Sequence, residues 1–434
     1  MMLFPRVQFL PGIQWFFFIF CNTVVIPPTL QSAFQLSDAA TLCLMQYSFI
    51  ATGLACVAQA ALGHGRAIME GPTGLWWGVI LTVTLAEAAH GTPLPVIGGS
   101  LAVGIALSGV ITVLIGLSGL GHRIAVLFRP AVMMVFMFLL GAQLLSLFIR
   151  GMLGLPFGVP QGPVNIDFPA FLLALAVAAL VVGIVVWLPS PWNKYGLLAG
   201  TLTGWAAYRI IFPQAVSPGT GTDWQWFPLG APQGLRGGII LTATLTGLLN
   251  ISNTFGALRG TQTFYPQQTP QYRRSFVVSG LFTLGSAVLG IVPFSPFVSS
   301  IGLLTQTNDN RKAPFILGAL VVVAIGLFTP LTAFFARIPL SISSAVLLVS
   351  YLPLLSSSLS FLPHIRLSSR NVYRLAIPLF SGIFLMGLPA GYLQEVPLWL
   401  RPLLSNGLLT GVMLAIVLEN LLPWDRVHAN NAPH

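Results

Sequence analysis

Charged residues are scarce in this sequence. Only 6% of its 434 residues are charged, whereas 55% are hydrophobic and the mean hydropathy is +0.87. A soluble domain carries roughly 25% charged residues, which it needs to cover a surface that faces water. The composition therefore excludes a soluble protein and indicates a chain whose main solvent is lipid.

Cysteine and the usual catalytic motifs are also scarce or missing. Cys21, Cys43 and Cys56 lie in or beside apolar runs, so we expect packing residues rather than disulfides, metal ligands or nucleophiles. The sequence shows no phosphate-binding loop, metal-ligand cluster or nucleophile elbow. We therefore predict neither an enzyme nor a bound cofactor or metal. Any uphill transport would have to use an ion gradient, such as that of protons.

The net charge of +10 does not indicate a nucleic-acid partner. The basic residues are scattered singly between apolar runs and form no patch. In a membrane protein such residues mark the cytoplasmic loops. The charge is therefore a guide to topology rather than to binding.

What the sequence does contain is a series of long apolar runs. A helix needs about 20 apolar residues to cross the hydrocarbon core. Two shorter runs, 69–89 and 291–307, are interrupted near their start by glycine or proline. The runs long enough for a full span are 12–32, 40–63, 97–118, 124–149, 168–188, 194–213, 238–258, 274–293, 313–336, 339–362, 372–389 and 402–422. The sequence thus predicts twelve full spans and two broken ones.

The basic residues agree with fourteen crossings and with both termini in the cytoplasm. This topology places Arg150, Arg209, Arg236, Arg337 and Arg401 outside. It places inside Arg6, Arg66, Arg123, Arg129, Lys194, Arg259, Arg273, Arg274, Arg311, Lys312, Arg366, Arg370, Arg374 and Arg426. Such an excess is the positive-inside pattern, and omitting either broken segment would destroy it. We expect a multi-pass protein of a bacterial inner membrane.

The two broken segments are the third and tenth of the predicted spans. Each therefore takes the same place in a half of seven spans, and an odd number of spans inverts the second half relative to the first. Asn22-Thr23 in span one and Asn253-Thr254 in span eight add a weak echo between the halves. Inverted repeats with paired broken helices are typical of secondary transporters, and the breaks point to the binding site.

Each break is expected to expose the N-terminus of a half-helix at mid-membrane. Such an end has unpaired N–H groups and a partial positive charge. Pro72 and Thr73, followed by Gly74, suit a helix start, and Ser299 and Ser300 are suitable N-caps. Two such ends facing each other would hold a flat molecule that is polar or weakly anionic. The alternative is that glycine and proline merely kink two spans.

Aromatic and amide side chains adjoin the breaks. A ring can stack on a nucleobase, so Trp76 and, on span eight, Phe255 are candidate ligand contacts. The alternative is that they are ordinary span residues, because tryptophan and phenylalanine are common in membrane spans and interfaces. Asn250 and Thr254 are four residues apart and share one helical face, with Asn253 next to it. These groups could read the edge of a base, or they could tie helices together as polar residues often do in bilayers.

Glu70 is the acidic residue beside a break. A carboxylate that is partly removed from water there could carry a proton. The alternative is an ion pair between Glu70 and Arg66 at the cytoplasmic mouth. Both readings remain open on the sequence.

Several short segments match a known pattern. The segments 23–27, 127–132 and 338–340 follow the pattern, and Gln14-Trp15 stands where the pattern has Gln-His. A further segment, 299–308, corresponds to a signature in which Gly302 and Thr307 match. With these segments the chain resembles the nucleobase–ascorbate transporter family, of the xanthine and uracil permease type, over nearly its whole length. Ser299, Ser300 and Asn308 depart from the signature.

The departures concern the positions that contact the base in that family. There the first signature residue and an acid on span eight bind the substrate, and here Ser299 and Asn250 take their places. The resemblance therefore implies a less charged site, which binds a neutral base or uses Glu70 as the substitute carboxylate.

The resemblance also implies an architecture and a mode of transport. It implies an all-α protein of fourteen spans, in which each broken span is a short strand plus a half-helix. Residues 1–122 and 237–338 would form a core, and residues 123–236 and 339–434 a gate. The core would slide against the gate in a homodimer within membrane lipid. The expected substrate is a purine such as xanthine, urate, guanine, hypoxanthine or adenine.

These patterns bear on three functions. A purine permease, either proton-driven or uncoupled, fits the amides and aromatic residues. An anion transporter, like the sulfate-transporter relatives of this fold, fits the half-helix ends, but no cation lies at the breaks. An intramembrane enzyme would need clustered acids, bases or metal ligands within the spans, and the sequence offers none.

Overall fold

The computed structural model describes residues 9–157, 164–189, 192–213, 224–365, 367–368, 371–422 and 424. Nearly all regular structure in these ranges is helical, which confirms the all-α prediction. The helices are α1 (Phe9–Val24), α2 (Ile26–Phe34), α3 (Asp38–Ala61), α4 (Gly74–Ala89), α5 (Leu94–Ser118), α6 (Gly121–Ile124), α7 (Pro130–Met152), α8 (Phe168–Trp187), α9 (Gly196–Ile211), α10 (Gly237–Gly260), α11 (Tyr272–Leu289), α12 (Ser300–Thr307), α13 (Lys312–Leu327), α14 (Thr329–Phe335), α15 (Leu340–Tyr351), α16 (Leu354–Leu359), α17 (Tyr373–Gly387), α18 (Arg401–Leu404) and α19 (Gly407–Leu421). Two strands are β1 (Glu70–Pro72) and β2 (Phe294–Pro296), and short 3-10 helices are η2 (Ala125–Leu127), η3 (Trp192–Tyr195), η4 (Gln262–Phe264), η5 (Leu362–His364) and η6 (Ala390–Leu393).

Seven helical segments of the described chain are long and apolar enough to cross a membrane, and the bent pair α13–α14 makes up to eight. Three shorter apolar helices are α4, α17 and α19. The chain is therefore a polytopic membrane protein, while the count of fourteen crossings stays a prediction. Arg6, Arg366, Arg370 and Arg426, used to predict the topology, lie outside the described residues.

Proline accounts for two of the places where the helices depart from the predicted spans. A further departure is the run 402–422, which is divided between α18 and α19. The run 313–336, expected as one span, is bent by 101° between α13 and α14. Pro330 lies in the first turn of α14, where it lacks an N–H and would clash with the preceding turn of a continuous helix. The Thr332 hydroxyl donates to the carbonyl oxygen of Ile325 at 2.6 Å and satisfies one group at the bend. The run expected from residue 124 begins its long helix only at Pro130.

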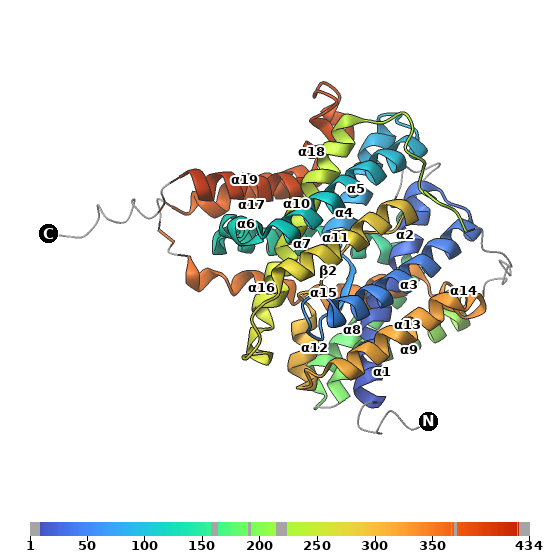
Figure 1. Ribbon diagram of the computed structural model, residues 1–434. Helices are drawn as coiled ribbons and strands as arrows, with labels where there is room; N and C mark the ends of the chain where they lie inside the picture. The colour runs from blue at the N-terminus through green and yellow to red at the C-terminus, as the bar shows by residue number, and fades with distance from the viewer. Residues whose placement is uncertain are drawn as a thin grey trace.

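The helices pack in two groups that each combine the two halves of the chain (Figure 1). In one group α5 packs against α10 and α11, and α13 packs against α1 and α3. In the other α7 packs against α15 and α19, α17 against α19, and α8 against α9. The first group contains both strands and both half-helices, so it holds the broken segments in place.

Glycine allows close approaches between these helices. A Cβ on Gly280 of α11 would lie 2.9 Å from the carbonyl oxygen of Gly109 on α5, which is shorter than side chains tolerate. A Cβ on Gly104 of α5 would meet the carbonyl oxygen of Ile240 at 2.8 Å. Small residues at helix crossings are what membrane proteins use to bring backbones together. They fix α5 against the two helices that line the candidate site.

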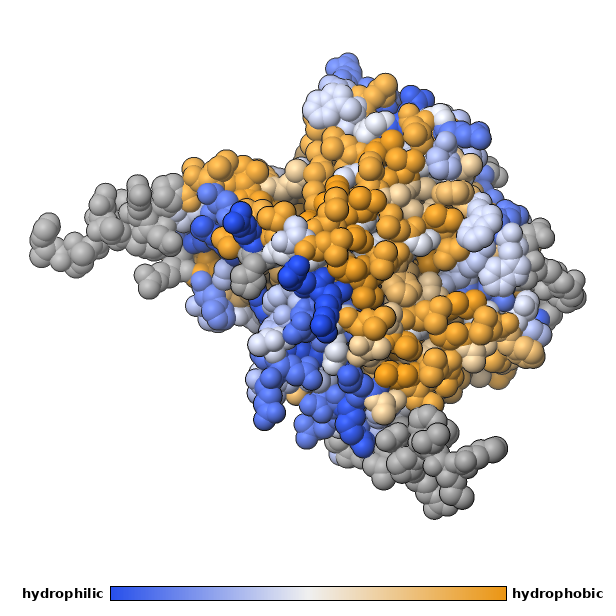
Figure 2. Space-filling view, viewed as in Figure 1, coloured by the Kyte–Doolittle hydropathy of each residue, from blue (hydrophilic) through white to orange (hydrophobic). Residues whose placement is uncertain are grey.

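The outer surface is largely apolar. Figure 2 shows a broad hydrophobic face across the molecule and a hydrophilic region below it, toward α12 and the N-terminal end of α11. On α5, Leu107, Leu114 and Leu117 are exposed by 45%, 57% and 58%. Such an exposed apolar face would cause aggregation in water, but it is what a lipid-facing helix presents.

Candidate functional site

The two broken segments meet in a short antiparallel sheet inside the helices. β1 pairs with β2 in the register Glu70 to Pro296, Gly71 to Ser295 and Pro72 to Phe294. The Phe297 amide donates to the Met69 carbonyl at 2.8 Å, and the Thr73 amide donates to the Pro293 carbonyl at 3.0 Å. Both strands are buried. The pairing satisfies backbone groups that would otherwise be costly at this depth.

The two half-helices begin differently. At α4 the Thr73 hydroxyl accepts a hydrogen bond from the Trp76 amide at 3.3 Å, so the predicted start is confirmed. At α12 the predicted serine caps are wrong. Ser299 has helical backbone angles and makes no capping bond, because the chain turns tightly there through bonds from the amides of 300–302 to the carbonyls of 297–299. The Ser300 hydroxyl accepts from the Met69 amide at 3.1 Å.

Asn250 of α10 ties both breaks together. Its side-chain oxygen accepts from the Thr73 hydroxyl at 3.1 Å and from the Asn253 amide at 3.0 Å. Its side-chain nitrogen donates to the carbonyl of Phe294 in β2 at 3.1 Å. Asn250 thus holds the start of α4 and the strand β2 in one fixed relation.

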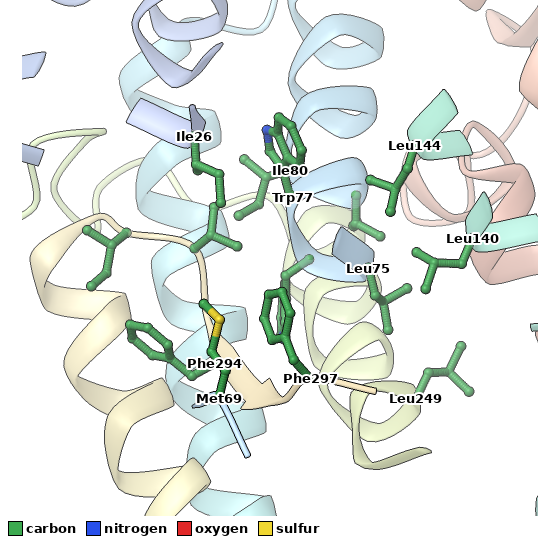
Figure 3. Close-up of a cluster of buried hydrophobic side chains, with 14 of the residues drawn as sticks. Ile26, Met69, Leu75, Trp77, Ile80, Leu140, Leu144, Leu249, Phe294 and Phe297 are labelled. Atoms are coloured by element: carbon green, nitrogen blue, oxygen red, sulfur yellow. The ribbon is translucent and has the colours of Figure 1, made fainter. Parts of the chain in front are cut away.

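A front cavity lies between the two half-helix starts. It is lined on one side by Thr73, Gly74, Asn253, Ser295 and Ser299, which come from the two breaks and α10. On the other side it is closed by Met137, Leu140 and Leu144 of α7 and by Tyr351 of α15. Figure 3 shows Leu75, Leu140 and Leu144 close together, with Phe297 between Met69 and Leu75. The front cavity therefore has a polar floor and an apolar wall.

The front cavity adjoins a much larger one. This vestibule has a volume of about 950 Å³ and shares Met137, Val298, Ser299, Tyr351 and Leu354 with the front cavity. Its lining is rich in aromatic residues, among them Phe17, Phe18, Phe255 and Phe361. Arg259 and His364 also line it, and the Arg259 guanidinium lies 5.7 Å from the centre of the Phe255 ring. A flat molecule could reach the front cavity through this space. Because the front cavity itself has a volume of about 40 Å³, a nucleobase bound there would also occupy part of the vestibule.

A second, smaller cavity lies behind the breaks. This rear cavity is lined by Trp76, Asn250, Thr254, Ser279 and Ser295, together with Ser108, Thr112, Thr283 and apolar neighbours. It leaves about 10 Å³ for the centre of a water molecule. That is room for about one water and far too little for a nucleobase.

The predicted site residues therefore divide between different surfaces. Gly74, Asn253 and Ser299 line the front cavity, as a binding role requires. Phe255 lines the vestibule, where it packs against Phe128, Tyr272 and Phe276. Asn250, Thr254 and Trp76 line the rear cavity, and Ser300 is buried against Met69. Asn250 and Thr254 do share a helical face, and that face points to the rear.

Sequence reasoning did not find the residues on the opposite wall. Tyr351 lines both the front cavity and the vestibule, and its hydroxyl donates to Asn22 of α1 at 3.3 Å. Met137 lines the same two cavities. An apolar methionine or a single tyrosine in a long apolar run gives no local signal, so only the packing of α7 and α15 reveals them. Arg259 also lines the vestibule, although the sequence pattern marks it only as a residue of a cytoplasmic loop.

Glu70 is fully buried and has no ion-pair partner among the described residues. Its Oε1 atom accepts from the Ser279 hydroxyl of α11 at 2.6 Å. The alternative of a pair with Arg66 is wrong. The Arg66 guanidinium donates instead to the carbonyls of Leu258 and Gln268 and to the side chains of Thr261 and Gln262, which tie the loop after α3 to the end of α10.

The sequence is similar to those of known transport proteins. A sequence model of a permease family, Xan_ur_permease, matches residues 6–391. YwdJ of Bacillus subtilis (strain 168), whose name assigns it to the purine permeases, is 27% identical over 97% of this chain and 97% of its own. The uric acid transporter UacT of Escherichia coli (strain K12) is 22% identical over 98% of this chain and 88% of its own.

A solved structure shares the fold. The transmembrane domain of the cyanobacterial bicarbonate transporter BicA superimposes with a TM-score of 0.59 at 15% identity, over 95% of this chain and 97% of that one. At this identity the likeness speaks for the fold alone. The family match, in contrast, covers most of the chain. The chain therefore belongs to the xanthine and uracil type of permease, the nucleobase–ascorbate transporters, and is a multi-pass membrane transporter rather than an enzyme.

Proposed function

We propose that this chain is a secondary transporter that carries a purine nucleobase across a bacterial inner membrane, with both termini in the cytoplasm. The observation that carries the proposal is the front cavity, where Gly74, Asn253 and Ser299 from the two breaks and α10 meet beside the vestibule. An amide and a hydroxyl can donate to and accept from the edge of a base, which presents both kinds of group. Among the described residues, the lining includes no carboxylate or cation, which suits a neutral ligand.

The aromatic lining supports a flat substrate. Phe297 and Tyr351 line the front cavity, and the phenylalanines of the vestibule lie on the way to it. Stacking on such a ring contributes about 1–3 kcal/mol for each base. Xanthine, urate, guanine, hypoxanthine and adenine all offer such a face, and UacT is named as a transporter of uric acid. The guanidinium of Arg259 in the vestibule could donate hydrogen bonds to the carbonyl oxygens of xanthine and urate.

Coupling to protons completes the proposal, with Glu70 as the group that carries the proton. Glu70 is a buried carboxylate in β1, the strand of the first break, which pairs directly with β2. A homodimer in which residues 1–122 and 237–338 slide against the rest, carrying the polar floor of the front cavity with them, would give alternating access. The bent and broken helices stay within the sliding group, and the wall of α7 and α15 stays behind.

Two observations sustain alternatives. Glu70 is absent from the lining of the front cavity, so an uncoupled uniporter would need no change in the binding site. Arg259 gives the vestibule a cation and no opposing carboxylate, and the fold resembles that of BicA, so an inorganic anion is the second candidate cargo.

Uptake into proteoliposomes tests the proposal. We expect one radiolabelled purine from a panel of the five bases and uracil to accumulate when a proton gradient points inward. Sulfate and bicarbonate, added as competitors, should not reduce its uptake. Glu70→Gln should abolish accumulation but retain exchange of labelled for unlabelled base, because exchange needs no net movement of protons.

Each other outcome selects an alternative. Equilibration that ignores the gradient would indicate a uniporter, and normal accumulation by Glu70→Gln would remove Glu70 from coupling. Transport of no base by protein of normal stability, with uptake of an anion, would overturn the purine proposal.

A further inference from the structure

Some polar side chains that line the rear cavity have no hydrogen-bond partner among the described residues. Trp76 and Ser295 are exposed by 0% and 2%, and both line the cavity. Within the described residues, neither the Trp76 indole N–H nor the Ser295 hydroxyl has a hydrogen-bond partner. Buried polar groups are almost always satisfied, and a small polar cavity with two or more such groups normally holds an ordered water. The space of about 10 Å³ fits one.

Ser279 joins this cavity to Glu70. It lines the rear cavity from α11 and is exposed by 4%. Its hydroxyl donates to Glu70 Oε1 at 2.6 Å and accepts from the Gln59 side-chain nitrogen at 2.9 Å. The Gln59 amide also donates to the Ser275 carbonyl, which fixes its orientation. The hydroxyl proton of Ser279 is thereby directed toward the carboxylate, and its second lone pair is available to the cavity.

Ser295 joins the same cavity to the front cavity. It lies in β2 opposite Gly71 and lines both spaces. The position that a side chain at Gly71 would take is occupied by the side chains of Met69 and Phe297. The polar groups therefore follow one order: front cavity, Ser295, rear cavity, Ser279 and Glu70.

We propose that Ser295, one water in the rear cavity and Ser279 form a proton path between the front cavity and Glu70; this inference rests on the transport function proposed above. The water gives a proton to the Ser279 oxygen while the Ser279 hydroxyl proton moves to Glu70 Oε1. The carboxylate becomes a neutral acid, and Ser279 keeps one proton. The water regains a proton through Ser295 from the front cavity, so every group except Glu70 returns to its starting state.

The charges around Glu70 suit a group that takes up a proton. On α3 the neighbours are the Cys56 thiol, bonded to the Glu70 backbone, and the neutral Gln59 amide. On α11 they are serines, and in β2 the paired residue is Pro296. Arg66, the nearest cation in sequence, is directed by its four hydrogen bonds to the C-terminal end of α10 and to the segment that follows it. Within the described residues no cation neutralises the Glu70 carboxylate. A proton that arrives along this path would neutralise it.

Ser279→Ala tests the path, because it removes the hydroxyl and keeps the carboxylate, the cavity and the front cavity. We expect gradient-driven accumulation of the purine to fall at least tenfold and to lose its dependence on pH. Base-for-base exchange should fall much less. Ser279→Thr, which restores a hydroxyl, should recover accumulation and its pH profile. The matched control is Ser286→Ala on the same helix, whose hydroxyl is equally buried but bonds only to the Phe282 carbonyl.

The outcomes are separable from failure of the transport function. Wild-type protein that exchanges no base would refute the transport proposal, whatever Ser279 does. If the wild type exchanges and accumulates, then normal accumulation with a normal pH profile in Ser279→Ala would overturn the path. Equal loss of accumulation and exchange in Ser279→Ala would also overturn it, because that pattern places Ser279 in substrate movement. A parallel loss in Ser286→Ala would show a general packing effect and overturn it likewise.

Discussion

The two broken segments hold matched places in the chain, yet they differ in how firmly they are built. α4 has 16 residues, a hydroxyl cap from Thr73 and a first turn that is largely buried. α12 has 8 residues and no side-chain cap, and part of it faces the vestibule. Asn250 bonds to the start of α4 and to β2 but not to α12 itself. The comparison indicates a fixed side, which sets the geometry of the breaks, and an adjustable side, which faces the vestibule.

The largest expected effect comes from removing the tie on the fixed side. Asn250→Ala leaves the Phe294 carbonyl, the Thr73 hydroxyl and the Asn253 amide without their partner. A buried group left unsatisfied costs about 1–3 kcal/mol, so we expect a clear fall in melting temperature as well as loss of uptake. Asn253→Ala removes only one bond and should cost about 0.5–1.5 kcal/mol while raising the KM for the purine.

Thermal unfolding of both variants in the same lipid or detergent measures this difference. Uptake kinetics on protein of matched folded fraction separates binding from stability. If Asn253→Ala were the more destabilising of the two, the assignment of Asn250 to structure and Asn253 to ligand would have to be exchanged.

A smaller effect is expected from adding a methyl group at the start of each half-helix. A Cβ on Gly74 would lie 2.5 Å from the Leu144 side chain of α7, whereas a Cβ on Gly302 would meet nothing within 4 Å. Overpacking costs about 1–3 kcal/mol. We therefore expect Gly74→Ala to slow uptake severalfold and Gly74→Val to slow it further. Both side chains would press α4 against Leu144 of α7, across the boundary along which the two groups of helices are proposed to slide. Gly302→Ala should stay within about twofold of the wild type, as substitutions without a steric conflict usually do.

Initial rates of uptake at saturating purine measure the effect of these three variants. Membrane expression and melting temperature serve as controls for folding. Equal slowing by the alanine variants at positions 74 and 302 would remove the distinction between a packed and an open half-helix.

The breaks could be predicted from the sequence because glycine and proline act locally. Pro72 and Thr73 start α4 as expected, and Pro130 and Pro330 fix helix starts that a hydropathy run blurs. The direction in which α10 faces could not be predicted. Asn250 and Thr254 were correctly placed on one face, but α10 carries polar and apolar residues all round, so the pattern does not say which cavity that face meets.

The partners of the charged residues were equally hidden. Arg66 and Glu70 are four residues apart, a spacing that favours a pair only on a helix. Here the intervening chain is a loop and a strand, so the side chains point to different helices, α10 and α11. Ser279 gave no sequence signal, because a serine in an apolar run usually bonds to its own helix. Only the tertiary contact reveals its role.

The smallest expected effect concerns the loop that ends the adjustable half-helix. α12 stops at Asn308, whose φ of 49° is left-handed, and Arg311 then donates to Asp309 from its backbone and its guanidinium. The hydrogen bonds from Arg311 lower the pKa of Asp309 below its ordinary value of 3.8. A carboxyl whose pKa is depressed by folding stabilises the folded state above its unfolded pKa, and this contribution is lost as the pH falls through the folded pKa.

Asp309→Asn should therefore lower the melting temperature slightly and by the same amount at pH 7 and pH 5. The difference from the wild type should shrink below about pH 4, where the unfolded-state carboxyl is protonated. High salt should shrink it too, because Arg311 is about half exposed, with 48% of its side-chain surface accessible. Melting curves at these pH values and at two salt concentrations measure both trends.

A difference that persisted unchanged below pH 4 and in high salt would mean that the charge of Asp309 does not hold this loop. The end of α12 would then depend on the left-handed turn at Asn308 alone.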